Sequence, residues 1–344
     1  MGTVSMSPGP VGPRQALFDR AEGGTPLPVC DHYAGVEPRM RKSLALQAEL
    51  GPVFDVTLDC EDGAPVGGEA EHAHQVAELL MSQENRYGRV GARTHPVDHP
   101  AFGLEADTLV KRAGSRLAYL MIPKPRGIAD VERACAEIDH QTRVHGHGRP
   151  VPVHVLIETH GALRDVERIA AHPRVESLSF GLMDFVSAHR GAIPATGMSA
   201  QGQFTHPLVL RAKLAIAAAC HGFAKTPSHC VVTEFNDMEA VAAAAKRASR
   251  ELGYTRMWSI HPNQIRPIVA AFAPDADEIE QAVEIIGAAQ AADWAPIRHL
   301  SAGRDTLHDR ASYRYFWQVL ERAARTGQAM PAEARAAWFD SPAA

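Results

Sequence analysis

The sequence predicts an α/β protein of the (β/α)8 type, a TIM barrel, with a C-terminal helical extension. Eight short apolar segments alternate with helical patterns within residues 27–275, and turn residues bound most of them. This alternation is typical of parallel strands joined by helices, and eight strands favour a closed barrel over an open sheet with a second domain. The chain of 344 residues is long enough for one such barrel with an extension.

The predicted strands follow one another along the chain, most of them separated by helical stretches. Residues 153–181 contain the clearest unit, because the apolar runs VHVLI and VESLSF enclose the helical pattern GALRDVERIAAHP. Two parallel strands joined by a helix in this way form a βαβ unit. The predicted strands are residues 27–35, 52–59, 89–93, 117–124, 151–158, 174–181, 229–232 and 255–260.

The helical patterns have recognisable limits. Pro38 lies near the start of the first predicted helix, residues 38–50, and Gly51 follows its end. From about residue 262 onward the pattern is helical throughout, which predicts the extension. Residues 1–26 contain Gly and Pro too densely for a packed element and predict a flexible segment. The expected parts of the chain are therefore residues 1–26, 27–275 and 276–344.

The composition excludes several classes of protein. A hydrophobic fraction of 45% and a charged fraction of 22% are typical of a globular enzyme. The net charge of −5 arises from interspersed signs, so we expect no nucleic-acid surface. The sequence has neither a secretory signal nor a run of about 18 apolar residues, so we expect no membrane segment and a cytoplasmic protein.

The cysteines predict reduced thiols in the core. They are odd in number, widely spaced and form no Cys-x-x-Cys motif, which argues against a disulfide framework and a structural zinc site. The five are Cys30, Cys60, Cys135, Cys220 and Cys230.

Polar side chains follow several predicted strands at their C-terminal ends, where barrels of this type carry their site residues. Glu158 follows the fifth strand and Asp184 the sixth, so the two carboxylates should meet at one edge of the sheet. Mg²⁺ often takes only one or two protein carboxylates and completes its coordination with water and substrate oxygens, so this pair predicts a magnesium site. The other residues expected at this mouth are Asp59, Glu61, Asp62, Arg93, Lys124 and His261.

Each of these residues also has a structural explanation. Arg93 could pair with Asp62 instead of binding a substrate carboxylate or oxyanion. Lys124 could be a solvated ion-pair partner, and the ring nitrogens of His261 could be satisfied within its own turn. Glu158 and Asp184 could be solvated loop acids.

Six short motifs along residues 27–315 give the sequence a resemblance to the citrate lyase β-subunit and malyl-CoA lyase family. No single motif is specific, but their order and their spacing match those of the family. The motifs are Leu58-Asp59-Cys60-Glu61-Asp62, Arg93 after a short strand, Pro123-Lys124, Ile157-Glu158-Thr159, Gly181 with Asp184, and Ile260-His261-Pro262 with Gln264.

The resemblance implies a Mg²⁺-dependent lyase that cleaves a citrate-, malyl- or citramalyl-type substrate, as an acyl-CoA, through an enolate. It implies Glu158 and Asp184 as metal ligands, and Arg93 as the residue that binds the substrate carbonyl or carboxylate, with Lys124 beside it. Glu61 and Asp62 would hold metal-bound waters. The family forms homotrimers or hexamers, so a homo-oligomer is expected.

The sequence departs from the family at three places. It has Cys30-Asp31-His32-Tyr33 where an Arg-Ser pair is common, His95 in place of an Asn, and residues 225–228 (KTPS) in place of an Asp-Gly pair. These departures leave open whether the acyl group is carried on CoA, on a carrier protein or on nothing. They also leave two rival functions, a thioesterase acting in the same site and a non-catalytic barrel that serves as an interaction subunit.

Asp309 lies in a short stretch, residues 307–310, that resembles a family motif in the C-terminal extension. In the family this motif covers the active site of a neighbouring subunit, and its Asp would serve as acid and base. The alternative is that Asp309 caps the helix that follows it by accepting hydrogen bonds from free N–H groups.

Overall fold

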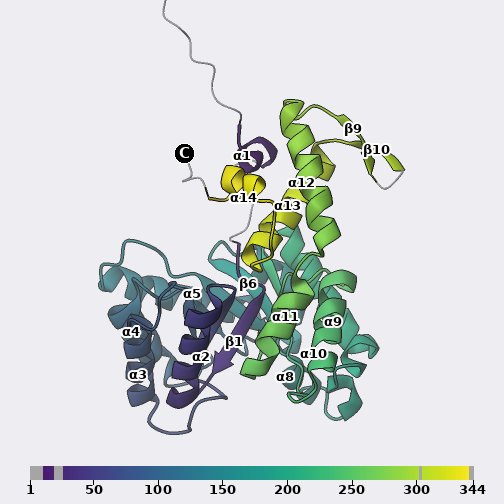
Figure 1. Ribbon diagram of the computed structural model, residues 1–344. Coiled ribbons are helices and arrows are strands. Elements are labelled where there is room, and N and C mark those ends of the chain that lie inside the picture. Colours follow the sequence, from purple (N-terminus) through teal and green to yellow (C-terminus); the bar gives the residue numbers. More distant parts are fainter. Residues whose placement is uncertain (1–10, 19–25, 302–303, 341–344) are drawn as a thin grey trace, which may run out of the picture. The chain divides into compact units, whose positions relative to one another are not determined.

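The computed structural model describes residues 11–18, 26–301 and 304–340 and contains a closed barrel of eight parallel strands (Figure 1). The strands follow one another around the barrel in the order of the sequence, and β8 pairs with β1 to close it. This confirms the predicted fold class. The strands are β1 (Cys30–Ala34), β2 (Phe54–Asp59), β3 (Val90–Arg93), β4 (Leu120–Ile122), β5 (Val153–Ile157), β6 (Val175–Phe180), β7 (Thr226–His229) and β8 (Arg256–Ser259).

Helices follow the strands and cover the outside of the barrel (Figure 1). An apolar core fills the space between the outward faces of the strands and these helices. The helices are α2 (Glu37–Leu50), α3 (Glu69–Met81), α4 (Phe102–Ala113), α5 (Ile128–Val144), α6 (His160–Arg164), α7 (Val166–Ala171), α8 (Leu182–Ser187), α9 (Pro207–Gly222), α10 (Met238–Glu251) and α11 (Ile265–Phe272). The five cysteines are buried free thiols, as predicted.

The seventh strand lies three residues before its predicted position. We predicted residues 229–232, but β7 is Thr226–His229, so that prediction was wrong. Ser177 and Ser179 of β6 pair with Thr226 and Ser228, which sets the register of a strand with few apolar side chains. The apolar run that suggested a strand instead follows β7 as a buried connection.

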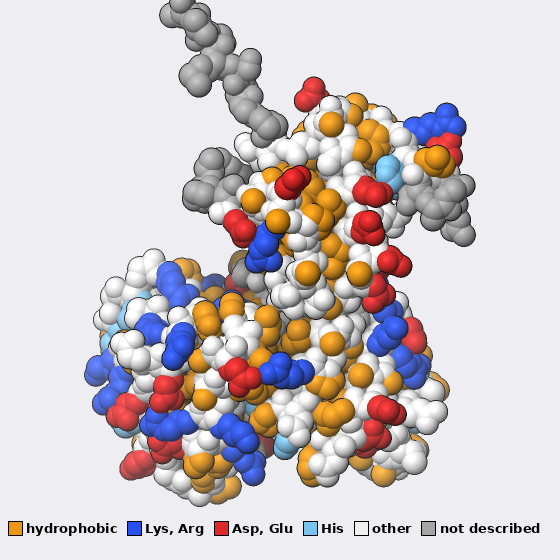
Figure 2. Space-filling model, in the orientation of Figure 1, with side chains coloured by type: hydrophobic (Ala, Val, Ile, Leu, Met, Phe, Trp, Pro, Cys, Tyr) orange, Lys and Arg blue, Asp and Glu red, His pale blue; other side chains and the backbone are white. Residues whose placement is uncertain are grey.

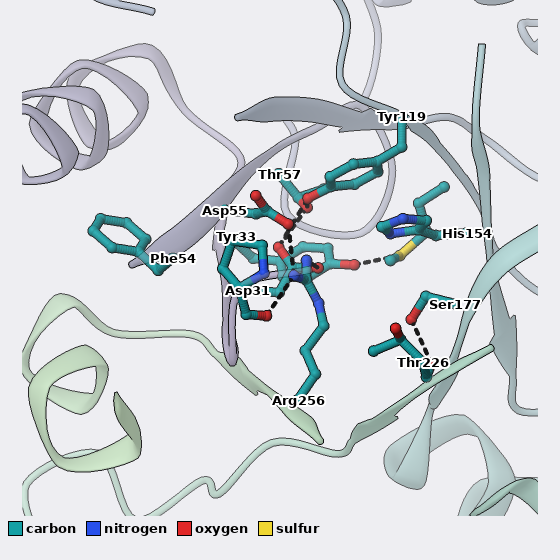
Figure 3. A network of polar contacts seen from close by, with 12 residues as sticks. Asp31, Tyr33, Phe54, Asp55, Thr57, Tyr119, His154, Ser177, Thr226 and Arg256 are labelled. Carbon is teal, nitrogen blue, oxygen red and sulfur yellow. Dashed lines mark hydrogen bonds and ion pairs between the residues drawn. The ribbon is translucent and has the colours of Figure 1, made fainter. Parts of the chain in front are cut away.

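The inside of the barrel carries an ion network near the N-terminal ends of the strands (Figure 3). Arg256 is fully buried, and its Nη1 donates a hydrogen bond to Asp55 Oδ2 at 2.6 Å. Its Nη2 lies 3.1 Å from Asp31 Oδ2. The hydroxyls of Thr57 and Tyr119 donate to Asp31 Oδ1 at 2.7 and 3.1 Å. Two carboxylates and a guanidinium are thus paired inside a sealed layer.

The chain forms two compact units, and the second contains the C-terminal elements and a short N-terminal helix. Leu17, in a segment where we expected no packed element, is buried in the core of this unit together with Ile285 and Trp317. The elements are α1 (Pro13–Leu17), α12 (Ala276–Ala291), β9 (Ile297–Ser301), β10 (Arg304–His308), α13 (Arg310–Arg325) and α14 (Ala332–Trp338).

The hairpin of β9 and β10 contradicts the prediction of a wholly helical extension. The strands are antiparallel, with Arg298 opposite Leu307 and Leu300 opposite Asp305. Arg298 Nε donates to Asp305 Oδ2 at 2.6 Å across the pair. Each strand has only five residues, which is too short for its alternation to stand out from the helical pattern on either side. The sequence therefore did not reveal them.

The surface shows mixed charge. On the face drawn in Figure 2, Lys and Arg side chains alternate with Asp and Glu side chains over α2 to α5. In the part of the chain that the structure describes, no helix combines the length and the apolar character that a membrane crossing requires.

Candidate active site

A cavity of about 740 Å³ opens at the C-terminal ends of the barrel strands. Its volume is in the range of pockets that enclose drug-sized ligands. Of the eight residues predicted at this mouth, six line the cavity, and the other two, Glu61 and Lys124, form ion pairs with them. The six are Asp59, Asp62, Arg93, Glu158, Asp184 and His261. The structure therefore brings the predicted strand-end residues together.

Arg93 is held rigidly at the end of β3. Its Nε and Nη2 donate to the two carboxylate oxygens of Asp59 at 2.7 and 2.6 Å. Its Nη1 lies 2.9 Å from Glu61 Oε2. Burial opposes the positive charge, but the carboxylate of Asp59 outweighs it and holds the pKa of Arg93 above its usual range. The ion-pair partners of Arg93 are therefore Asp59 and Glu61. The alternative that the sequence suggested, a pair with Asp62, is not formed.

Asp59 was expected at the mouth, but its role in fixing Arg93 was not foreseen. Burial alone would raise the pKa of Asp59, yet the charge and hydrogen bonds of Arg93 bring it below its usual value. The backbone N–H groups of Glu61 and Gly63 donate to its oxygens at 3.0 and 2.7 Å. A Cβ at Gly63 would lie 2.4 Å from Asp59 Oδ2, so the turn needs a glycine there.

Lys124 is a partly exposed side chain that connects the carboxylates of the mouth. Its Nζ lies 2.6 Å from Glu61 Oε1, 2.8 Å from Asp62 Oδ2 and 3.9 Å from Asp184 Oδ1. Its backbone N–H donates to Glu158 Oε1 at 2.6 Å. The backbone of Lys124 has a φ of 48°, in the left-handed region that residues other than glycine rarely adopt. Such strained backbone conformations are found most often at functional sites.

Glu158 and Asp184 have different environments. Glu158 is a buried residue with 3% of its surface exposed, whereas the side chain of Asp184, in the first turn of α8, is 46% exposed. Burial, and after it the charge of Asp184, raises the pKa of Glu158 to about 8. Gly181 makes this arrangement possible, because a Cβ there would lie 2.3 Å from Glu158 Oε2.

The charges at the strand ends are unbalanced in a way that fits a divalent cation. Five carboxylates and two cations meet there: Asp59, Glu61, Asp62, Glu158, Asp184, Arg93 and Lys124. Glu158 and Asp184 could supply two hard oxygen ligands, and Mg²⁺ commonly takes one or two protein carboxylates. Among the described residues no group of three or more His, Cys, Asp or Glu has the arrangement of a metal cage. Because both side chains offer carboxylate oxygens, they fit Mg²⁺ with water and substrate oxygens in its other positions.

Two histidines of the mouth are held by hydrogen bonds, one within its own turn and one between β1 and β8. His261 Nδ1 accepts from the N–H of Asn263 at 3.3 Å, which agrees with the turn interpretation. His32 was not predicted as a site residue, although it lines the cavity. Its Nδ1 lies 3.0 Å from Ser259 Oγ, and burial lowers its pKa to about 4, so the ring is neutral at physiological pH.

Asp309 begins α13 in the second compact unit. Its Oδ1 accepts hydrogen bonds from the N–H groups of Ala311 and Ser312 at 3.0 and 3.3 Å. The hydroxyl of Ser312 accepts in return from the Asp309 N–H at 3.0 Å. Asp309 thus caps the helix, as the structural alternative proposed, and its carboxylate is exposed. Its catalytic role stays a prediction.

The sequence is similar to that of known enzymes. The family model described as HpcH/HpaI aldolase/citrate lyase matches residues 44–262. An L-malyl-CoA/β-methylmalyl-CoA lyase from Cereibacter sphaeroides is 30% identical over 265 residues, which cover 74% of this chain and 83% of that protein. A malyl-CoA/β-methylmalyl-CoA/citramalyl-CoA lyase from Chloroflexus aurantiacus is 26% identical over 277 residues, which cover 73% of this chain and 77% of that protein.

Solved structures extend this similarity. A crystal structure of a citrate lyase from Burkholderia xenovorans LB400 has 56% sequence identity and a TM-score of 0.81, and the match covers 96% of this chain and 99% of that one. The protein CitE from Mycobacterium tuberculosis, in complex with magnesium, acetoacetate and coenzyme A, shares the fold with 18% identity and a TM-score of 0.65, covering 87% of this chain and 98% of that one. The chain belongs to the HpcH/HpaI aldolase/citrate lyase family and is a carbon–carbon lyase of the citrate lyase β-subunit and malyl-CoA lyase type.

Proposed function

We propose that the protein uses Mg²⁺, held by Glu158 and Asp184, to cleave a 2-hydroxy acid of the citrate, malyl or citramalyl type, or its CoA thioester. The observation that carries the proposal is that these two carboxylates and the fixed guanidinium of Arg93 line one cavity. The names of the Cereibacter and Chloroflexus relatives support a malyl-type thioester. The magnesium and coenzyme A bound to the Mycobacterium protein support the choice of metal and carrier.

The residues of the mouth have separate tasks in this proposal. Lys124 holds Glu61, Asp62 and Asp184 near one another, and its N–H orients Glu158. Glu61 and Asp62 would accept hydrogen bonds from water molecules bound to the metal. Bound Mg²⁺ would supply Lewis-acid polarisation of a substrate oxygen and offset developing negative charge.

Arg93 would bind the substrate carbonyl or carboxylate and stabilise the enolate. In the cleavage, a base removes the proton of the substrate hydroxyl and the carbon–carbon bond breaks. The electron pair of the broken carbon–carbon bond forms the enolate, and the hydroxyl-bearing carbon becomes the carbonyl carbon of the released oxo acid. Because Asp59 already holds Arg93 in place, little reorganisation of the guanidinium is needed as charge develops.

The enolate is then protonated, and we assign this step to Asp309 of a second copy of the chain. A carboxylate that arrives on a neighbouring copy can exclude water and transfer the proton. This requires a homo-oligomer, for which we propose three or six copies. Light scattering on the purified protein measures that number, and a monomer at micromolar concentration would contradict the assignment.

A substrate panel tests the reaction. Citrate, malyl-CoA, citramalyl-CoA and free 2-hydroxy acids are incubated with enzyme and Mg²⁺, and both oxo acid and free thiol are measured. Oxo-acid release is the expected result. Release of thiol alone from the CoA substrates would show that the site is a thioesterase instead.

Replacing Asp184 with Asn tests the metal site itself. We expect Asp184→Asn to lower kcat by at least about 100-fold, or ~2.7 kcal/mol of barrier, because a ligand charge is lost. The melting temperature should change little, since the side chain is at a solvent-exposed rim. Calorimetric titration with Mg²⁺ should show weakened binding. A variant that keeps more than about a tenth of kcat would contradict the metal role.

A further inference from the structure

We propose that the enzyme acts on 2-hydroxy acids that carry a bulky apolar substituent, alkyl or aryl, and that this substituent binds on an apolar floor within the cavity. The floor consists of Tyr33, Met121, Leu156, Val231 and Trp258, which form a hydrophobic cluster separate from the outer core of the barrel. The inference rests on the proposed function, because the metal and Arg93 hold the acid end of the same molecule.

The floor is an organised layer and not a chance gathering of side chains. The rings of Tyr33 and Trp258 stack with centroids 4.2 Å apart and an interplanar angle of 28°. Met121 and Leu156 are fully buried beneath the cavity, while Tyr33, Val231 and Trp258 line it. Tyr33 donates its hydroxyl hydrogen to the sulfur of Met121, so this hydroxyl is engaged within the layer.

The floor directly adjoins the charged end of the site. The guanidinium carbon of Arg93 lies 5.3 Å from the centroid of the Tyr33 ring. A 2-oxo acid whose carboxylate reaches Arg93 therefore has its substituent within reach of Tyr33 and Trp258. Below the floor, Asp31 and Arg256 belong to the sealed ion network near Tyr33 (Figure 3).

The charges around the floor argue against a short dicarboxylic acid placed there. In this proposal Arg93 is used by the acid end of the substrate, and Lys124 is paired with Glu61 and Asp62. The other lysine and arginine side chains that line the cavity, Arg39 and Lys42, are exposed residues of α2. A second carboxylate on the floor would be desolvated without a cation of its own, which is costly, whereas an apolar group there gains by leaving water.

The cavity is also larger than a three-carbon acid requires. Pockets of this size enclose drug-sized ligands, so the 740 Å³ has room for a larger substituent beside the acyl part of the substrate. Each methylene that is buried on the floor should improve binding by about fourfold. The affinity of a series of 2-oxo acids should therefore rise with the size of the substituent.

The test is calorimetric binding of 2-oxo acids to the full-length enzyme with Mg²⁺. The series is pyruvate, 2-oxobutanoate, 4-methyl-2-oxopentanoate and phenylpyruvate, with oxaloacetate as the short dicarboxylic acid. We expect 4-methyl-2-oxopentanoate and phenylpyruvate to bind at least about tenfold more tightly than pyruvate or oxaloacetate. Equal affinities across the series would overturn the inference and leave the proposed function standing, whereas no binding by any member would overturn both.

Two substitutions connect the affinity to the floor. Trp258→Ala should reduce the ratio of affinities between the larger acids and pyruvate to less than about threefold. Its circular dichroism spectrum and urea unfolding transition show separately that the variant is folded. The matched control is Trp338→Ala in the second unit, which should keep the whole series unchanged. If Trp258→Ala weakens every acid by the same factor, Trp258 has no specific role toward the substituent and the inference fails.

Fluorescence gives an independent reading that does not depend on affinity. Trp258 is the one tryptophan within residues 27–275, and the other three lie at 294, 317 and 338. Binding of 4-methyl-2-oxopentanoate should change tryptophan emission in the wild type, and the change should be absent in Trp258→Phe, which keeps an apolar ring. An emission change that persists in Trp258→Phe would place the substituent elsewhere and contradict the proposal.

Discussion

Two buried arginines in the same barrel are each held by a pair of carboxylates, yet they serve different purposes. Arg256 is fully enclosed with Asp31 and Asp55 near the start of the strands. Arg93 is 9% exposed, is held by Asp59, and lines the cavity at the ends of the strands. The pairing chemistry is the same, so position along the strand decides which guanidinium can meet a ligand.

Charge balance is the second difference between the two clusters. In the interior, Arg89 pairs with Asp55 at 2.7 Å, so two arginines face two carboxylates, Asp31 and Asp55. At the mouth, five carboxylates face Arg93 and Lys124. The interior cluster needs no further charge, whereas the excess of carboxylates at the mouth suits the cation that we propose there. The comparison therefore supports a structural role for the interior cluster and a binding role for the mouth.

The largest effect that we expect concerns the interior cluster. Arg256→Met should lower the free energy of unfolding by roughly 3–5 kcal/mol, because it leaves Asp31 and Asp55 buried with half of their positive charge removed. Urea unfolding measures the loss. Arg298→Met is the matched control, since Arg298 forms an ion pair with Asp305 but its side chain is 80% exposed, and it should change stability little. If Arg256→Met lowers the free energy of unfolding by less than about 1 kcal/mol, the interior cluster does not have the structural role that distinguishes it from the mouth.

The corresponding change at the mouth should affect catalysis instead. Arg93→Lys should raise the barrier by roughly 2–3 kcal/mol, about 30- to 150-fold in kcat/KM, because an ammonium cannot reproduce the planar fork that contacts Asp59, Glu61 and the substrate. Stability should fall less than in Arg256→Met, since a positive charge remains beside both carboxylates. A near-normal kcat/KM would show that Arg93 has only a structural role, like Arg256.

The buried carboxyl of Glu158 predicts a pH dependence of the protein's stability. In the folded metal-free protein the pKa of Glu158 is about 8, whereas in the unfolded chain the carboxyl loses its proton near its ordinary pKa of about 4.5. Stability from this group is therefore full below about pH 4.5 and is lost as the pH rises toward 8. Between pH 6 and pH 8 the free energy of unfolding in EDTA should fall by on the order of 2 kcal/mol.

Glu158→Gln is the control for this experiment, because its amide does not titrate. The difference in stability between wild type and Glu158→Gln should change across pH 6 to 8 and remain constant below pH 4. Adding Mg²⁺ should stabilise the wild type more at pH 8 than at pH 6, since the metal competes with the proton for the carboxylate. Parallel pH curves for the two proteins would contradict the raised pKa.

Much of the fold and the membership of the site could be predicted from the sequence because both depend on periodicity. Alternating strands and helices define a barrel, and strand ends on one edge bring Glu158 and Asp184 to the same cavity. The error at β7 has the same origin, since Thr226–His229 has few apolar side chains and its register is set by β6. Hydrophobic periodicity cannot locate a strand whose position is set only by its hydrogen bonds to the neighbouring strands.

The partners within the site could not be predicted because they depend on side-chain direction. Sequence spacing brings Arg93 equally near Asp59, Glu61 and Asp62, and only the structure shows the paired hydrogen bonds to Asp59. The left-handed backbone of Lys124 has no sequence signal, because the residue is neither Gly nor Asn. The aromatic floor was missed for another reason: Tyr33 and Trp258 are far apart in the chain and meet only because β8 pairs with β1.

The smallest expected effect tests a carboxylate outside the barrel. Asp309→Ala should lower the free energy of unfolding by about 1 kcal/mol, because the N–H groups of Ala311 and Ser312 lose their acceptor. If Asp309 also supplies the proton to a neighbouring copy, the variant should be inactive. It should regain partial activity when refolded together with inactive Glu158→Ala protein, since some sites in the mixed oligomer then receive both intact residues.

Ser312→Ala separates the two roles of Asp309. It removes the reciprocal half of the capping box while leaving the carboxylate of Asp309 in place, so it should lower stability by a similar or smaller amount and keep kcat. Equal activity of Asp309→Ala and Ser312→Ala, both near wild type, would mean that Asp309 serves the helix alone. If Asp309→Ala is inactive and stays inactive after refolding with Glu158→Ala protein, Asp309 does not act on a neighbouring copy. A residue that acts between copies would be supplied by the Glu158→Ala chains, which keep Asp309 intact.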